Sequence, residues 1–302
     1  MESVPEIFKK KMEGLKVYPP YATELLIEEY FYNYFIKHNL NLNRIYLPIL
    51  WTSLYLSRKS GRNIDDLKLF IKNLDTKKKY FTIVQHCRGI LCDVSHLDLL
   101  IISTGTGRNY NTNHFKTREI VKINKNNIAD IPIPLLGNPS LKYNNIKKDI
   151  LCSFVGNLDN HKELRYKMYE NLHNKKNFLL EKGQYNAKGS FKHYYNILCR
   201  SKFSLCPRGV GISSFRLYES LQCLAIPIYI YDDVAWLPYK EKINWQEIAI
   251  IIHESEIHKI YEIINNFSEE KIIIYQNRIK LLLDDYFTIK GLSNYIKDFL
   301  YR

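Results

Sequence analysis

The chain has 302 residues, of which 46% are hydrophobic, and its formal net charge is +13. A hydrophobic content of this size excludes a disordered chain, and the length favours two domains that each bury a core of their own. The positive charge favours an anionic partner, but the scattered basic residues argue against a dedicated nucleic-acid-binding module.

The distribution of apolar residues and cysteines excludes further classes of protein. No apolar run reaches the roughly 18 residues of a membrane span, and the first residues are charged where a secretory signal is apolar. The six cysteines show neither a Cys-x-x-Cys pair nor the spacing of a zinc site. We therefore expect reduced, structural thiols in a cytoplasmic protein without a transmembrane segment. Peripheral contact with a membrane surface stays compatible with the charge.

In the first half of the chain, apolar residues alternate between helical and strand-like spacing. Residues 23–35 carry apolar side chains at helical spacing and predict a strongly amphipathic helix. Shorter runs predict strands at 44–50, 80–87 and 97–104, and helices at 51–58 and 64–74. The proline-rich residues 131–134 indicate an extended connector. We place the domain boundary near residue 145, which divides the chain into 1–145 and 146–302.

The second half alternates strands with helices. Predicted strands occupy 149–155, 202–206, 225–231 and 247–252, and predicted helices occupy 191–200, 254–267, 268–286 and 291–301. Further helices are expected around Arg165 and after residue 213, and the last helix is expected to pack back on the first domain. This alternation implies parallel sheets, in which ligands bind beyond the carboxyl ends of the strands. Asn157, Arg208 and the pair Asp232-Asp233 follow such strands and should meet at one edge.

The most informative segment is 204–220, where a buried strand leads through a glycine loop into a helix. Gly209 and Gly211 allow a tight turn and a close approach of the backbone to a ligand. Ser213 or Ser214 is a good N-cap, so the helix should begin there. Open N–H groups and the helix dipole make such an N-terminus an anion site.

Charged residues on the same segment fit a nucleotide. Arg208 and Arg216 could neutralise a diphosphate through planar, multidentate hydrogen bonds. Glu219 has the character to accept hydrogen bonds from the ribose hydroxyls. The competing interpretation is a surface ion pair between Arg216 and Glu219, which would have little energetic value.

These residues resemble the hallmark of the exostosin glycosyltransferases, glycosyltransferase family 47. The run from Ser201 to Ile228, with its Cys-Pro-Arg-Gly and Ser-Phe-Arg pieces, carries the most specific part of the resemblance. Other pieces are similar to the family in the same order along residues 80–290. They are 81–89, 130–134, 149–157 with Arg165, Trp236-Leu-Pro-Tyr239 and Asn244-Trp245.

The resemblance implies an α/β protein of the GT-B type, with two Rossmann-like domains whose parallel sheets face each other across a cleft. It also implies an inverting hexosyl- or pentosyltransferase of glycan biosynthesis that uses no cofactor and no metal. The donor would be a nucleoside diphosphate sugar, by family default a UDP-sugar, and the acceptor a glycan or another hydroxyl compound. The chain contains no Asp-x-Asp, which agrees with metal independence. The donor-binding residues that the resemblance implies are Asn157, Arg165, Arg208, Gly209, Gly211, Ser213, Ser214, Arg216 and Glu219.

A general base for the acceptor hydroxyl is expected from the first domain. His86 at the end of a predicted strand and Asp93 in the following loop are the catalytic candidates. His96, Asp98 and Glu28 stand behind them. A histidine at a strand end is more often structural, and Asp93 could equally be a turn or capping residue. Cys87 stands where the family often has an acid, so the base stays open.

Two other functions fit parts of the sequence. Residues 209–214 with Asp232 imitate the dinucleotide-binding fingerprint of NAD(P) oxidoreductases, but the third glycine is a serine. The charge and the tyrosines suggest a non-enzymatic binder of nucleic acid or acidic glycan, for which no recognised module is present. The resemblance favours the transferase, with a nucleotide sugar and a glycan as partners and without nucleic acid.

Overall fold

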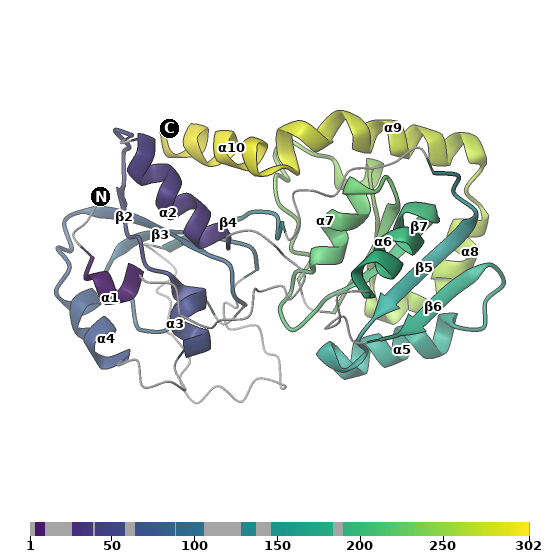
Figure 1. Cartoon of the computed structure of the whole chain (residues 1–302), viewed down its shortest axis with the longest axis horizontal. Helices are drawn as coiled ribbons and strands as arrows, with labels where there is room; N and C mark the ends of the chain where they lie inside the picture. The colour runs from purple at the N-terminus through teal and green to yellow at the C-terminus, as the bar shows by residue number, and fades with distance from the viewer. Residues whose placement is uncertain are drawn as a thin grey trace. The chain divides into compact units, whose positions relative to one another are not determined.

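The structure of the protein is a computed structural model, which describes residues 4–9, 26–38, 40–57, 64–87, 89–105, 128–136, 146–183, 190–232 and 234–301. These residues form two compact units, each with one parallel sheet (Figure 1). The first unit contains the described residues up to Ile133 together with Ser293–Arg302, and the second contains Pro134–Leu292. The predicted boundary at residue 145 lies outside the described residues. The predicted α/β class with two parallel sheets is confirmed.

The sheet of the first unit has the strand order β1-β2-β3-β4, and all neighbours are parallel. Its strands are β1 (Ile45–Tyr46), β2 (Lys79–Val84), β3 (Asp98–Ser103) and β4 (Ile128–Pro132). β1 is shorter than predicted because Pro48 has no N–H to donate to the ladder. The predicted connector at 131–134 is in part the edge strand β4, which tolerates Pro132 as its last residue.

Helices cover this sheet and enclose an apolar core. They are α1 (Glu6–Lys9), α2 (Ile27–His38), α3 (Trp51–Ser57), α4 (Ile64–Lys72) and the greater part of α10 (Ile289–Tyr301). Trp51 and Tyr80 are fully buried in the core. A hydrogen bond joins the end of α10 to this unit: Asn43 Nδ2 donates to the carbonyl of Tyr301 at 3.2 Å.

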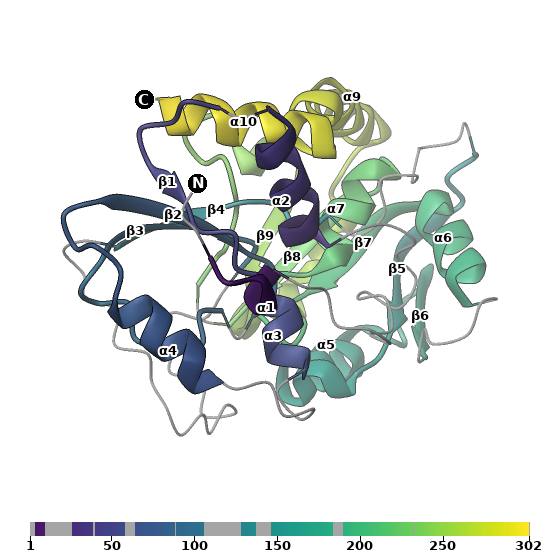
Figure 2. The same ribbon diagram turned by 60° about the vertical axis from the view of Figure 1, so that its left-hand side comes forward.

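The sheet of the second unit has the order β6-β5-β7-β8-β9, and again all neighbours are parallel. Figure 2 shows it from another side. Its strands are β5 (Ile150–Gly156), β6 (Phe178–Lys182), β7 (Ser201–Pro207), β8 (Ile226–Tyr231) and β9 (Ile250–His253). The sequence did not predict β6, a partly exposed edge strand of only five residues.

Helices flank the second sheet (Figure 1). They are α5 (Lys162–Leu172), α6 (Ser190–Arg200), α7 (Phe215–Gln222), α8 (Ile260–Asn265) and α9 (Glu269–Tyr286). The predicted helix 254–267 is divided into a 3₁₀ segment, Glu254–Lys259, and α8. Ser268 caps the start of α9, since its Oγ accepts from the N–H of Lys271 at 3.1 Å.

Lys148 fastens the start of this sheet. Its Nζ donates to the carbonyl oxygens of Cys199, Ser201 and Cys223 at 2.9–3.0 Å. Burial lowers the pKa of this ammonium to about 8. The three bonds join the segment before β5 to the ends of α6 and α7, at the amino edge of the sheet.

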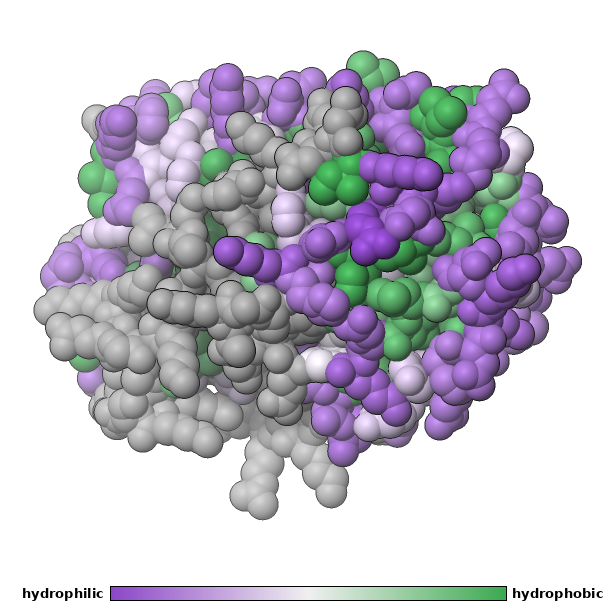
Figure 3. Space-filling model, turned by 45° about the vertical axis from the view of Figure 1, so that its right-hand side comes forward, coloured by the Kyte–Doolittle hydropathy of each residue, from purple (hydrophilic) through white to green (hydrophobic). Residues whose placement is uncertain are grey.

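The six cysteines are free thiols, five of them buried. None of the described helices is long and apolar enough to cross a membrane. On the face that Figure 3 shows, hydrophilic residues cover much of the described surface, with hydrophobic residues between them.

Candidate functional site

The carboxyl ends of β5, β7 and β8 meet at one edge of the second sheet, as predicted. The ladder runs in register to this edge, where Pro207 pairs with Ile230 and the N–H of Arg208 donates to the carbonyl of Ile230 at 3.3 Å. The turn that starts at Asn157, the loop that starts at Arg208 and Asp232 therefore share this edge. Asp233 lies outside the described residues.

The loop after β7 leads into the N-terminus of α7. Ser214 is the N-cap of α7, with extended backbone angles of φ −145° and ψ 135°, and its side chain makes no capping hydrogen bond. The loop is closed on itself by the N–H of Gly209, which donates to the carbonyl of Ser213 at 3.4 Å. The N–H of Leu217 donates to the carbonyl of Ser214 at 3.2 Å. Because the side chain of Ser214 does not cap this turn, a helix N-terminus of this kind is suited to an anion.

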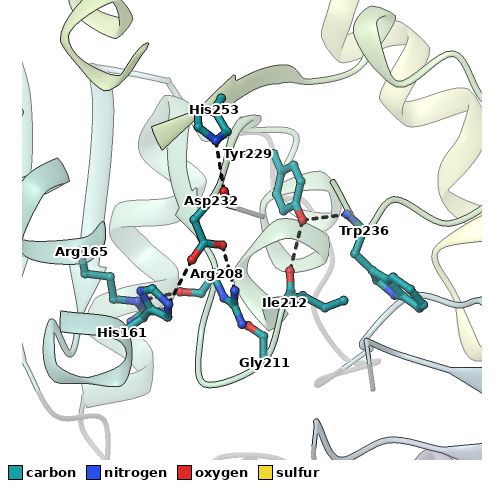
Figure 4. A network of polar contacts seen from close by, with 9 residues as sticks. All are labelled: His161, Arg165, Arg208, Gly211, Ile212, Tyr229, Asp232, Trp236 and His253. Carbon is teal, nitrogen blue, oxygen red and sulfur yellow. Dashed lines mark hydrogen bonds and ion pairs between the residues drawn. The ribbon is translucent and has the colours of Figure 1, made fainter. Parts of the chain in front are cut away.

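A buried tyrosine clamps this loop to the segment after β8 (Figure 4). The Tyr229 hydroxyl donates to the carbonyl of Ile212 and accepts from the N–H of Trp236, both at 3.1 Å. Burial raises the pKa of Tyr229, so the hydroxyl stays protonated and able to donate. The clamp holds the anion site in a fixed conformation.

Two arginines lie against the ring of Phe154, which belongs to β5. The guanidinium of Arg216 is 4.3 Å from the ring centroid and that of Arg165 is 5.8 Å from it. Arg165 Nε donates to the carbonyl of Arg208 at 2.9 Å and its Nη1 to that of Asn157 at 2.5 Å, so this side chain holds both loops together.

The two arginines are buried cations that lie close together. Arg165 and Arg216 are only 4% and 8% exposed. Burial, and after it the charge of Arg216, lowers the pKa of Arg165 to about 9. Burial disfavours the ionised form of a guanidinium, and a nearby cation adds to this effect. An anionic ligand at this position would favour the ionised form of Arg165.

Arg216 and Glu219 are both buried, so the interpretation as a surface ion pair is wrong. Arg216 Nη2 donates to the carbonyl of Val155 at 2.6 Å. Glu219 is 1% exposed and accepts from the hydroxyl of Tyr194 on α6 at 2.6 Å. Both charged side chains are therefore held by partners inside the protein.

Arg208 is engaged with a carboxylate (Figure 4). Its Nη1 is 2.8 Å from Asp232 Oδ1 and its Nε donates to the carbonyl of Gly211 at 3.2 Å. His161 Nε2 lies 3.2 Å from Asp232 Oδ2. Burial by itself raises the pKa of Asp232, but the hydrogen bonds of His161 and Arg208 outweigh it and lower that pKa well below its ordinary value. Asp232 is therefore ionised.

The remaining predicted donor-binding residues lie at the same edge. Asn157 is half-buried and accepts from the N–H of Asp159 at 2.8 Å, so its side chain shapes the turn after β5. Ser213 and Ser214 are 6% and 7% exposed, and Gly209 and Gly211 are half-buried. The structure thus brings all nine predicted donor-binding residues together.

Gly156 is a position at which a methyl group should impair the site. A Cβ atom there would lie 2.6 Å from Nη2 of Arg216. We expect Gly156→Ala to displace this guanidinium and to weaken nucleotide binding by at least about tenfold. Isothermal titration calorimetry with UDP checks this. Gly183→Ala is the matched control, because its Cβ would meet nothing within 4 Å, and an equal loss in both variants would contradict the prediction.

The two predicted catalytic residues lie in the first unit. His86 follows β2, is 8% exposed and stacks on Tyr55 with ring centroids 4.2 Å apart. Asp93 is exposed, and its Oδ1 accepts from the N–H of Ser95 at 2.9 Å, which is the geometry of a turn. His86 thus has the ordered surroundings of a functional side chain, and Asp93 has the contacts of a turn residue.

Glu28, on α2, forms the centre of a buried network beside His86. Its Oε1 accepts from Thr52 Oγ1 at 2.7 Å and from the N–H of Gln85 at 2.8 Å, and its Oε2 accepts from the N–H of Thr52 at 2.9 Å. Thr52 Oγ1 in turn accepts from the N–H of His86 at 3.0 Å. The network fixes the backbone position of His86.

Glu28→Gln should remove a pH dependence of stability. Burial raises the pKa of Glu28 from 4.5 to about 7, against the hydrogen bonds of Gln85 and Thr52, which lower it. The folded state therefore holds a proton that the unfolded state releases, so stability is highest below pH 4.5 and falls as the pH rises through about 7. The loss is at most about 3 kcal/mol.

Urea unfolding at about pH 5 and about pH 8 measures this difference. The wild type should lose stability between the two values, and Glu28→Gln should lose clearly less. An unchanged difference in the variant would assign the pH dependence to other groups.

His161 and His253 were not singled out from the sequence, and no contact with Glu219 was predicted for Tyr194. Tyr194 reads there as a core aromatic, and only the fold brings it to Glu219. His161 and His253 both contact Asp232, from the turn before α5 and the end of β9. The sequence held a signal for His253, because this residue ends β9 at the carboxyl edge of the sheet. Asp232 directly follows the end of β8 at the same edge.

Comparison with known proteins gives independent information. The exostosin GT47 domain matches residues 96–267. Exostosin-1 of Drosophila melanogaster is 34% identical over 95 residues, which are 31% of this chain and 12% of that protein. Exostosin-1 of Bos taurus is 32% identical over 96 residues, which are 32% of this chain and 13% of that protein. The chain thus matches only a small part of the length of these curated relatives.

Similarity to solved structures is more distant. The pneumococcal O-GlcNAc transferase GtfA, solved in complex with UDP and GlcNAc, is 14% identical, with a TM-score of 0.40 over 77% of this chain and 58% of that chain. TarM is 9% identical, with a TM-score of 0.40 over 72% of this chain and 54% of that chain. The family match, in contrast, covers more than half of the chain and includes the glycine loop, α7 and all nine predicted donor-binding residues. This chain therefore belongs to the exostosin GT47 family of glycosyltransferases.

Proposed function

We propose that this protein is an inverting glycosyltransferase of the GT-B type, which moves a sugar from a UDP-sugar to a hydroxyl group of a glycan. The observation that carries the proposal is the convergence of Arg165, Arg208 and Arg216 at the N-terminus of α7, where the side chain of Ser214 makes no capping hydrogen bond. A diphosphate matches the charge and the donor geometry of these guanidinium groups. It also matches the N–H donors of the helix.

Each arginine retains a donor for such a ligand. Among the described residues, Arg165 and Arg208 form their hydrogen bonds through Nε and Nη1, which leaves Nη2 of each for a phosphate oxygen. Because the other nitrogens are bonded, the guanidinium groups are already oriented when the ligand arrives. Preorganised donors of this kind stabilise the charge that develops on a leaving diphosphate. These cations would make a metal ion unnecessary for departure of the leaving group.

The acceptor side of the reaction requires a base. We assign this role to His86, which the Glu28 network holds at the end of β2. The acceptor oxygen forms a bond to the anomeric carbon while the bond from that carbon to the diphosphate oxygen breaks. The bonding pair leaves with the diphosphate, the hydroxyl proton passes to the imidazole, and the configuration is inverted.

A ligand panel tests the proposal. Thermal unfolding of the whole chain is measured with UDP, GDP, NAD and a single-stranded RNA, and UDP should raise the midpoint most. Release of UDP from UDP-sugars in the presence of glycan acceptors then measures transfer, and the anomeric configuration of the product shows whether it is inverted. Stabilisation by NAD without any nucleoside diphosphate would instead support an oxidoreductase. Stabilisation by RNA alone would support a nucleic-acid binder.

A further inference from the structure

Asp232 combines fixed partners with an accessible carboxylate. Arg208 and His161 each contact one of its oxygens, and His253 donates through Nε2 to its backbone carbonyl at 3.1 Å (Figure 4). The carboxylate is 18% exposed, whereas the side chains of Arg208 and His161 are only 2% and 8% exposed. Asp232 is thus the most exposed of these three side chains.

The carboxylate retains acceptor capacity. An ionised carboxylate has about four acceptor positions, and the contacts with Arg208 and His161 use one on each oxygen. The second position on each oxygen can accept from a hydroxyl or amide group of a ligand. Two neighbouring sugar hydroxyls have the donor spacing that the two oxygens of a carboxylate accept.

Asp232 also lies next to the proposed diphosphate site. Its partner Arg208 begins the loop that leads to α7, and Nη1 of this arginine is bonded to Asp232 while Nη2 is left for a phosphate. A sugar linked to that phosphate would lie within a few bond lengths of Arg208. Its ring hydroxyls would therefore be close to the carboxylate.

We infer that Asp232 recognises the donor sugar by accepting hydrogen bonds from its hydroxyl or amide groups, so that the site takes neutral sugars and rejects uronic acids. This inference rests on the proposed function. A neutral sugar presents donors to Asp232. A uronic acid presents a second carboxylate, and two carboxylates close together at a partly buried site repel each other. The cation and the histidines around Asp232 are already engaged with it and give the second carboxylate no dedicated partner.

Binding of matched donor pairs tests the inference. Dissociation constants are measured by calorimetry for UDP, for UDP-glucose against UDP-glucuronic acid, and for UDP-galactose against UDP-galacturonic acid. The wild type should prefer the neutral member of a pair by at least about tenfold, since charge repulsion of this kind costs several kcal/mol when unrelieved. Asp232→Asn, which keeps an oxygen for Arg208 but removes the charge, should lose most of this preference.

The control variant His161→Gln removes one partner of Asp232 and leaves its carboxylate, so the preference should persist. A wild type that binds UDP but prefers the uronic acid, or an Asp232→Asn variant with an unchanged preference, would overturn the inference and leave the proposed function standing. Failure of the wild type to bind UDP would overturn both the inference and the proposed function. If Asp232→Asn does not fold, the preference of the wild type for neutral over uronic acid donors decides whether the inference holds.

Discussion

Arg216→Met is expected to reduce kcat/KM for sugar transfer by about a thousandfold, because single preorganised donors to a developing anion contribute factors of this order. Methionine retains much of the length of arginine and its contact with the ring of Phe154, which the guanidinium now covers at 4.3 Å. The variant loses the bond to the carbonyl of Val155 and the positive charge at the start of α7. The loss should therefore appear mainly in the chemical step and in UDP affinity, while the fold is kept.

Arg200→Met is the matched control for this prediction. Arg200 ends α6 in the same unit, is 41% exposed and pairs with Asp149 at 2.6 Å. We expect activity within about twofold of the wild type, since exposed ion pairs contribute little. Steady-state rates at several donor concentrations compare the two variants. If Arg216→Met were as active as Arg200→Met, the diphosphate would not be held where we place it.

Glu219→Gln is expected to weaken UDP binding by roughly 5- to 30-fold, the difference between a hydrogen bond to a charged acceptor and one to a neutral amide. Glutamine keeps an oxygen for the Tyr194 hydroxyl, which now donates to Glu219 at 2.6 Å. The packing of α6 against α7 should therefore be retained. Calorimetric titration with UDP measures the change.

Titration with 2′-deoxy-UDP shows whether the ribose is what Glu219 contacts. The wild type should bind the deoxy nucleotide more weakly than UDP, and Glu219→Gln should bind both with similar affinity. Inorganic pyrophosphate, which has no ribose, should bind the variant at least as well as the wild type, because a nearby negative charge is removed. Equal loss of affinity for all three ligands would show that Glu219 acts only through the position of Arg216.

Much of the donor site could be predicted because its signals are local in the chain. The apolar strand β7, the proline at its end, the loop glycines and Ser214 at the N-cap all lie between residues 201 and 214. Parallel strands then bring the ends of β5, β7 and β8 to one edge. The local sequence signals and the predicted fold class therefore led to the same position for the donor site.

The partners of the charged side chains could not be predicted, because they are set by tertiary structure. Tyr194 and Glu219 are 25 residues apart, and Arg208 and Asp232 are 24 residues apart, with a helix or strand between them. The sequence suggested Arg208 as a direct diphosphate ligand, and the structure shows that Asp232 takes one side of its guanidinium. β6 was missed because its apolar run, residues 178–180, is too short to stand out as a strand.

In the first unit, the sequence did not show which charged side chains would be buried. Glu28 opens an amphipathic helix, where an acid is usually solvated and complements the helix dipole. Here the packing of α2 on β2 encloses it, at 1% exposure. Asp93, which reads equally well as a base, is held in a turn by Ser95.

The three carbonyl contacts of Lys148 have a chemical consequence for the amine itself. An amine whose pKa is about 8 would be readily acylated near neutral pH if reagents could reach it. Its ammonium protons are instead committed to the backbone oxygens of Cys199, Ser201 and Cys223. Lys148 should therefore resist acetylating reagents until this edge of the sheet opens, and the mass of its peptide after labelling would report that opening.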